Sequence, residues 1–145
     1  MIMKRILTAV LLLSVAVFAK ADDRPVTFDR LPVSAQTFVK KYFPTEKVTF
    51  ATIDDDLIRP DYEVALSDGT KMDFDHSGQL LNIESRKNPL PEGIVPVQIC
   101  NYVKDNYPET SIIEYEVKRK AYEIKLTNRL ELKFNSNFQL IEIDD

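Results

Sequence analysis

Cysteine is almost absent from this chain, since Cys100 is the only one in 145 residues. A chain with one cysteine forms no disulfide within itself, so a hydrophobic core alone must hold the fold together. Cys100 lies beside the apolar stripe of an expected helix, where a thiol usually acts as a small buried apolar group. The sequence places no activating neighbour beside it, which argues against a redox or nucleophilic role.

Histidine and glycine are also scarce, with one and three residues. Three glycines exclude a glycine-rich phosphate-binding loop. The single histidine, His76, follows Asp73 and Asp75 but has no second histidine or cysteine near it, which disfavours transition-metal binding and acid–base chemistry there. Ser77 follows it in an expected turn, but adjacency in the sequence does not by itself pair a nucleophile with a base. We therefore expect no catalytic residue, no cofactor and no enzyme activity.

The first 21 residues have the pattern of a cleaved signal peptide. Lys4 and Arg5 precede the apolar run Ile6–Phe18, and Ala19-Lys20-Ala21 offers small residues at a cleavage site. The apolar run is shorter than the roughly 20 residues that span a bilayer. This predicts export to the periplasm or the medium, with a mature chain starting at Asp22 and no membrane anchor after cleavage.

The mature chain, residues 22–145, is acidic and has the size of one domain. Without Lys4, Arg5 and Lys20 it keeps 16 of the 19 basic residues against all 23 acidic ones. This excess disfavours nucleic acid and anionic membranes as partners. It promotes solubility and favours a basic protein as a partner.

Two segments of the chain repeat. Residues 62–83 return at 122–143 without a gap, at an offset of 60 (122 − 62). Two proline-led amphipathic helices precede them, beginning at Leu31-Pro32 and Val95-Pro96, and both end at an aromatic residue before proline. Their stripe positions are Ala35, Phe38, Val39 and Tyr42 in the first helix and Ile99, Tyr102, Val103 and Asn106 in the second.

The pattern predicts an α+β fold made of two tandem repeats, residues 31–85 and 95–145, joined by a linker at 86–94. Each repeat contains one helix and four strands, and both helices cover one face of a single antiparallel sheet of about eight strands. The other face is left open to water. The expected strands are 48–53, 62–66, 70–75 and 80–85, then 112–118, 121–126, 130–135 and 140–143.

Alternation assigns most strand residues to a face. Apolar residues recur at every second strand position, and we expect their side chains to face the core. They include Val64, Leu81, Ile83, Ile141 and Ile143. The first strand of each repeat is ambiguous. In one register Thr49, Ala51 and Ile53 face the core together with Ile113, Tyr115 and Val117; in the other, Val48 and Phe50 face it.

The open face is the best candidate for a binding surface, because flat sheets serve as protein-binding platforms and an edge strand, either 26–28 or the last one, can accept an added strand. Two alternative sites, for a metal or small ligand, are Asp73, Asp75 and His76, or the acidic loop Asp54–Asp56. The candidate interface residues are Val48, Phe50, Glu63, Lys71, Asp73, Tyr115, Glu123, Lys125, Glu131 and Lys133.

The duplicated pattern resembles that of a known family. A helix ending in aromatic-Pro, then Tyr-Glu-Val-Ala-Leu-Ser-Asp-Gly-Thr and Phe-Asp-His-Ser-Gly-Gln-Leu-Leu, is similar to the PepSY-like family of exported bacterial proteins. The resemblance covers about residues 31–143, and the second copy departs from it at Asn128-Arg129 and Phe138. It implies a fold similar to the β-lactamase inhibitor protein and a periplasmic or secreted binding module that restrains an enzyme such as a peptidase. It carries over no functional residue.

Overall fold

The computed structural model describes residues 23–54, 58–86 and 88–145. The expected signal peptide and the loop residues Asp55 and Asp56 lie outside this part of the chain. Among the described helices, none combines the length and apolarity needed to cross a membrane.

A single antiparallel sheet of nine strands runs through the molecule, with its strands side by side in chain order. The short hairpin connections produce this order, since they leave no room for a crossover. The prediction of about eight strands did not count β1, two residues that pair with the end of β2. The edge strand proposed at 26–28 lies at 24–25 instead, and residue 28 begins a 3-10 helix. The strands are β1 (Arg24–Pro25), β2 (Val48–Ile53), β3 (Tyr62–Leu66), β4 (Lys71–Phe74), β5 (Leu80–Glu84), β6 (Ile112–Lys118), β7 (Ala121–Leu126), β8 (Glu131–Asn135) and β9 (Leu140–Asp144).

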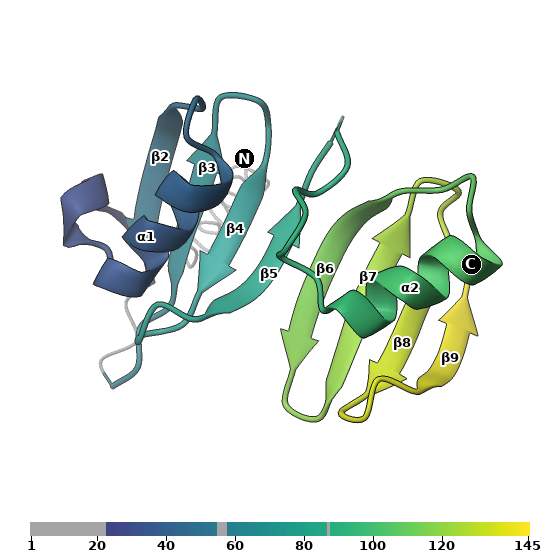
Figure 1. Ribbon diagram of the computed structural model, residues 1–145. Helices are drawn as coiled ribbons and strands as arrows, with labels where there is room; N and C mark the ends of the chain where they lie inside the picture. The colour runs from purple at the N-terminus through teal and green to yellow at the C-terminus, as the bar shows by residue number, and fades with distance from the viewer. Residues whose placement is uncertain (1–22, 55–57, 87) are drawn as a thin grey trace, which may run out of the picture.

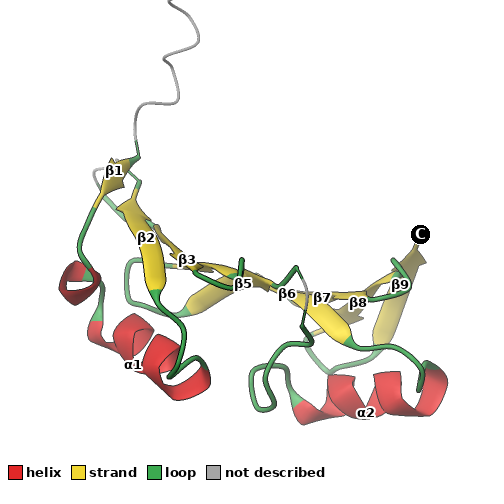
Figure 2. Ribbon diagram, turned by 90° about the horizontal axis from the view of Figure 1, so that it is seen from above, coloured by secondary structure: helices red, strands yellow, loops and turns green. Residues whose placement is uncertain are grey.

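Two ten-residue helices, α1 (Val33–Tyr42) and α2 (Val97–Asn106), lie on the same face of the sheet (Figures 1 and 2). A short 3-10 helix, η2 (Phe28–Arg30), precedes α1. Pro32 and Pro96 occupy the N-cap positions. The C-cap of each helix is the aromatic residue before proline, Phe43 or Tyr107, where the backbone leaves the helical conformation. The α+β architecture with one open sheet face is therefore as predicted.

The core lies between the helices and the sheet. Each helix directs an aromatic ring edge-on against a buried phenylalanine, with centroids 5.6 Å apart for Phe38–Phe74 and 5.5 Å for Tyr102–Phe134. The most deeply buried side chains come from both halves of the sheet: Val64, Met72, Phe74, Ile83, Ile124, Leu126, Leu132 and Phe134.

The strands β5 and β6 join the two halves into one sheet through three residue pairs, with Ile83 opposite Tyr115 at the centre. The linker supports this junction, because the backbone N–H of Leu90 donates to the Ile112 carbonyl at 2.9 Å. The hydrophobic core is continuous across the junction.

Each half contains a β-bulge in its first strand, and this bulge resolves the ambiguity in register. The pairing shifts between Val48 and Phe50, and again between Ile112 and Glu114. Ala51 and Tyr115 are therefore buried on the helix side, as the first register proposed, while Phe50 is on the open face. Thr49 is the extra residue of the bulge and is exposed. Because of this extra residue, the side chain of Val48 points to the helix side and packs against the core.

A second pair of bulges corrects the assignment of the last strand in each half. Phe74 pairs with Leu80 while Asp73 pairs with Asn82, so Leu81 is the extra residue and is displaced to the open face. The same shift makes Leu140 the core residue of β9 and leaves Ile141 55% exposed. The predicted core positions of Leu81 and Ile141 are therefore wrong, and Ile143 on the edge strand is 50% exposed.

Candidate binding surface

The side chains of the open face form two continuous rows, because each residue pairs with its neighbour on the next strand. Both rows cross from β2 to β9. The first row consists of Phe50, Ala65, Lys71, Glu84, Glu114, Lys125, Glu131 and Asp144. The second row consists of Thr52, Glu63, Asp73, Asn82, Glu116, Glu123, Lys133 and Glu142.

These rows contain nine carboxylates and only three lysines. Several carboxylates lie directly opposite one another, which destabilises a sheet. Lys118 forms an ion pair with Glu123 and offsets part of the charge. The like-charged neighbours are Glu63–Asp73, Glu84–Glu114, Glu116–Glu123 and Glu131–Asp144.

The electrostatic effect is largest at Asp73. Burial, followed by the negative charge of Glu63, raises the pKa of this carboxyl from 3.8 to about 6. A hydrogen bond from Asn82 opposes the shift, whereas Glu84 and Asp61 add to it. Asp73 is therefore partly protonated in mildly acidic solution and gains a full charge only near neutral pH.

A second crowded pair lies where the two halves join. Glu114 on β6 faces Glu84 on β5, and its pKa is raised by burial, with Lys125 acting in the opposite direction. A hydrogen bond to Glu84 and the charge of Glu84 both add to the shift. A cation placed between these strands would relieve the repulsion.

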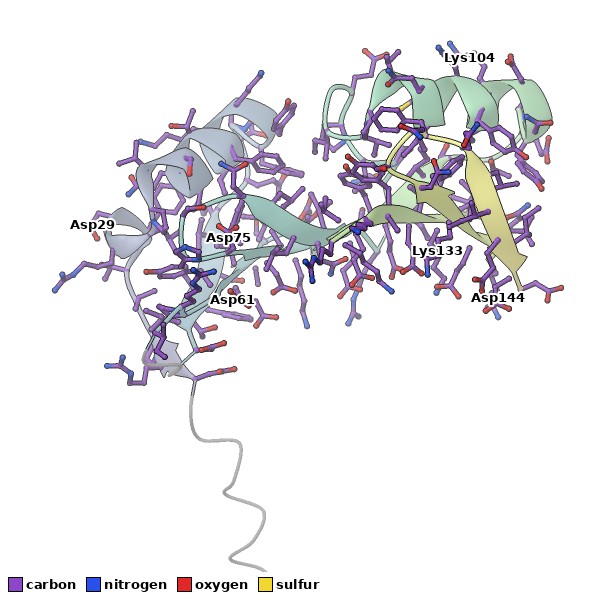
Figure 3. All side chains as sticks on the ribbon, turned by 90° about the horizontal axis from the view of Figure 1, so that it is seen from below. Asp29, Asp61, Asp75, Lys104, Lys133 and Asp144 are labelled. Carbon is purple, nitrogen blue, oxygen red and sulfur yellow. The ribbon has the colours of Figure 1, made fainter. Side chains whose placement is uncertain are left out.

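The open face is concave. In Figure 2 both ends of the sheet turn away from the helices, and Figure 3 shows Asp61, Lys133 and Asp144 on the side opposite Lys104 of α2. A groove of about 460 Å³ lies on this face near the junction. It is lined by Asp23, Thr52, Asp54, Asp61, Tyr62, Glu63, Asp73, Leu81, Asn82, Glu116 and Val117.

The structure brings most of the predicted interface residues onto this face, but Val48 and Tyr115 are corrected. Tyr115 is 5% exposed in the core, where burial and then Tyr122 raise its pKa to about 12, and Val48 packs on the helix side. Phe50 is 43% exposed on the open face. The residues that lie in the rows as expected are Glu63, Lys71, Asp73, Glu123, Lys125, Glu131 and Lys133.

Glu114 and Glu116 were missed as candidates. Polar and apolar residues alternate within 112–118, and this pattern is the signal for them. It was not decisive because the sequence left open which of the two sets faces the core. Once the bulge is located, both carboxylates fall on the open face beside the half formed by β2–β5.

The alternative site at Asp73, Asp75 and His76 is not assembled. The Asp75 carboxylate accepts backbone N–H groups of Ser77 and Gln79, both at 2.9 Å, within its own turn. Burial raises the pKa of Asp75, but these hydrogen bonds outweigh it and hold the pKa below its usual value. Asn135 makes the same two bonds in the other half, so Asp75 serves as a turn former. Within the described residues, no group of three or more acidic, histidine or cysteine side chains could hold a metal ion.

Cys100 lines an apolar cleft of about 730 Å³ between α2 and the linker. Its thiol is directed at the Val95 carbonyl, 3.7 Å away, and burial, followed by the charge of Glu92, raises its pKa. The thiolate is therefore disfavoured, which fits the predicted packing role.

Comparison with known proteins identifies similar families and structures. The family model described as "Putative beta-lactamase-inhibitor-like, PepSY-like" matches residues 60–142. A solved structure described as a "putative periplasmic protein from DUF2874 family" of Bacteroides vulgatus is 35% identical. It superposes with a TM-score of 0.83 and covers 88% of this chain and 100% of its own.

Two further solved structures are similar to this chain over most of its length. One is described as a "putative calcium-regulated periplasmic protein" of Bacteroides thetaiotaomicron, with 38% identity, a TM-score of 0.83 and coverage of 86% of this chain and 98% of its own. The other is described as a "putative periplasmic protein of unknown function" of Bacteroides vulgatus, with 31% identity, a TM-score of 0.80 and coverage of 85% and 99%. No curated protein sequence matches this chain.

Proposed function

This chain belongs to the PepSY-like, β-lactamase-inhibitor-like family of periplasmic proteins, and from that premise we propose that it binds a basic partner protein on its concave sheet face. The chain acts in the periplasm or outside the cell. The partner is expected to present lysine and arginine side chains to this face.

The observation that supports this proposal best is the alignment of carboxylates across neighbouring strands. A sheet selected for stability alone would place opposite charges in such pairs. Four pairs of facing carboxylates break that rule on one face. Departures of this kind concentrate at functional sites, where the cost is recovered on binding.

The shape of the face also suits a protein partner. The sheet is concave, and the groove near the junction mixes carboxylates with the apolar side chain of Leu81. Leu81 reaches the groove only because of the bulge in β5. An arginine or lysine of the partner could place its aliphatic stem against Leu81 and its cationic end near Asp73.

We propose that the protein is not an enzyme. Within the described residues, the side chains that chemistry would require serve other purposes: the Ser77 hydroxyl donates to Asp75 at 2.7 Å, and the thiol of Cys100 has a raised pKa. A binding module restrains a partner enzyme simply by covering its active site. The family's description as beta-lactamase-inhibitor-like supports such an inhibitory role toward an enzyme, and we propose a peptidase as one class of target.

We also infer that the two halves are tandem copies of one unit. The support is the constant sequence offset of 60 between 62–83 and 122–143, and the bulges that recur at Thr49 and Ile113 and at Leu81 and Ile141. Duplication extends one binding face to twice its width. The scaffold recurs, while the charges of the face differ between the halves.

The proposal is tested by crosslinking and recovering partners from a periplasmic extract. The wild-type protein should retain a specific basic protein, and the double charge reversal Glu63→Lys with Glu116→Lys should lose it. Retention should also fall steeply with added salt. As a matched control, Asp105→Lys changes an exposed residue of α2 on the opposite side of the molecule and should leave retention unchanged.

Recovery of no specific partner, even after crosslinking, would count against the proposal. Equal retention by the wild-type protein and the double reversal would place the binding surface elsewhere.

Calcium binding in the same groove is a second candidate, supported by the description of the Bacteroides thetaiotaomicron relative as calcium-regulated and by the excess of carboxylates that line the groove. The described carboxylates form no ready-made site of three or more ligands, so calcium would have to draw them together. Calorimetry with calcium should then show saturable binding that Asp73→Ala abolishes. The same titration with zinc, repeated on His76→Ala, tests the alternative site at the turn. A flat calcium titration of the wild-type protein would rule this candidate out.

A further inference from the structure

The strand β9 (Leu140–Asp144) forms an exposed edge of the sheet. Among the described strands it pairs with β8 alone, so one side of its backbone has no strand beside it. The opposite edge is blunted, because β1 has only two residues and one of them, Pro25, has no backbone N–H. An added strand is therefore accommodated at β9 and discouraged at β1.

The side chains of β9 define what an added strand must carry. Glu142 faces Lys133, and Asp144 faces Glu131, so these two carboxylates end the two acidic rows on the concave face. Ile143 faces the buried Leu132 on the helix side, yet it is 50% exposed because no further strand covers it. The edge thus alternates acidic, apolar and acidic positions.

We propose that β9 accepts an extended segment of a basic partner as a tenth, antiparallel strand. The segment places two basic residues beside Asp144 and Glu142 on the concave face, and one apolar residue beside Ile143 on the other face. Its sequence pattern is therefore basic–apolar–basic, with alternate residues pointing to opposite faces. This inference rests on the proposed function and adds that a segment of the partner is bound as a strand.

A second copy of this chain is a poor occupant of the same edge. In an antiparallel pair of two β9 strands, Glu142 faces either itself or Asp144 of the other copy, and like charges directly opposite destabilise the pair. The carboxylates that discourage self-pairing favour a basic strand. Charge complementarity therefore selects the occupant.

The test uses a synthetic peptide, Lys-Val-Lys-Val-Lys-Val-Lys, acetylated and amidated at its ends. We expect saturable binding by calorimetry and slower hydrogen exchange of the β9 amides in the complex. Two further peptides carry N-methyl groups on all lysine or on all valine amides. Strand pairing uses alternate amides, so one of the two methylated peptides should lose binding.

Charge variants separate the edge from the rest of the face. Glu142→Lys with Asp144→Lys should weaken peptide binding about tenfold, since two cross-strand charge pairs become repulsive. The double reversal Asp105→Lys with Glu109→Lys is the matched control, because it reverses the same number of charges at exposed residues of α2 and of the turn after it, on the helix side of the molecule. It should leave the affinity within about twofold.

Three results would overturn the inference: equal binding by all three peptides, an equal loss in the control Asp105→Lys with Glu109→Lys, or concentration-dependent dimers of the free protein that protect the β9 amides. If the partner recovered from the periplasm still depends on Glu63 and Glu116 while β9 binds no peptide, the edge inference fails and the proposed function stands. If β9 binds the peptide and the double reversal at Glu63 and Glu116 has no effect on retention of the partner, the edge inference stands and the proposed binding at the centre of the concave face fails.

Discussion

Gly78 shows how a single residue fixes the contact between a turn and a helix. Its φ is +89°, and an added Cβ would overlap the Ser34 hydroxyl and lie 2.9 Å from Cβ of Pro32. The hydroxyl of Ser34 donates to the Ser77 carbonyl at 2.8 Å, which holds the turn over the start of α1. The corresponding residue of the other half is Phe138, which adopts φ 63° and stacks on Tyr122.

We expect Gly78→Ala to lower the free energy of unfolding by about 2–4 kcal/mol, since it adds both a strained φ and a steric overlap. Urea denaturation measures the loss. Gly69→Ala is the control: its φ is also positive, at +91°, but the nearest atom to a new Cβ is 3.6 Å away, so it should lose only about 1 kcal/mol. Equal losses at the two positions would contradict the steric argument.

Asp73 should make the stability of the free protein depend on pH. Because its pKa is raised to about 6, the folded protein retains a proton that the unfolded chain releases between about pH 4 and 6. The contribution to stability is therefore complete at low pH and is lost as the pH rises through about 6. We expect Asp73→Asn to remove this slope and to gain about 1 kcal/mol at pH 7, a value reduced because the carboxyl is partly exposed.

Urea unfolding at several values between pH 4 and 7 tests this expectation. Asp75→Asn provides a control of opposite sign, since the pKa of Asp75 is lowered and its contribution is lost as the pH falls. Identical pH profiles for the wild-type protein and Asp73→Asn would show that Asp73 is not the responsible group.

At the scale of secondary-structure elements, the two helices pack on the sheet with different side chains. Ala35 of α1 and Ile99 of α2 occupy corresponding positions, and both are fully buried. Val39 and Val103, one turn later, are buried in the same way. The helix α2 thus depends on a larger side chain for its contact with the core.

Ile99→Ala should therefore leave a cavity beneath α2 and lower the free energy of unfolding by about 2–5 kcal/mol. Thermal or urea denaturation gives the value. Val97→Ala, in the same helix but at a side chain that is 64% exposed, should cost less than about 0.5 kcal/mol. Similar losses in the two variants would mean that Ile99 does not anchor α2 to the sheet.

At the scale of the whole molecule, the acidic rows make the free protein sensitive to salt. Raising the salt concentration from about 10 to about 150 mM shortens the Debye length from about 30 to about 8 Å and screens repulsion between facing carboxylates. We expect the melting temperature to rise by about 2–4 °C. Calorimetry of the free protein at the two concentrations measures the change.

The paired substitution Glu63→Gln with Glu84→Gln removes two like-charged contacts across strands. It should raise the melting temperature in low salt and reduce the response to added salt. An unchanged salt response would show that the repulsion is already relieved in the free protein.

The local sequence determined the elements of this fold. Proline at the start of each helix, an aromatic residue before proline at the end and strict alternation in residues 62–66 and 122–126 are local signals, and each acts over a few bonds. They were sufficient to predict both helices, the hairpins, the antiparallel order and the single covered face. They were also sufficient to place Glu63, Asp73 and Lys133 on the open face.

Only the tertiary structure decided the bulges and the shape of the face. One extra residue in a strand reverses the direction of every side chain beyond it, and the pairing with the neighbouring strand selects its position. This is why Leu81 and Ile141 left the core, why Tyr115 entered it, and why Glu114 and Glu116 joined the acidic rows. The concavity and the facing carboxylates depend on strands far apart in the chain, so the binding surface is a property of the assembled sheet.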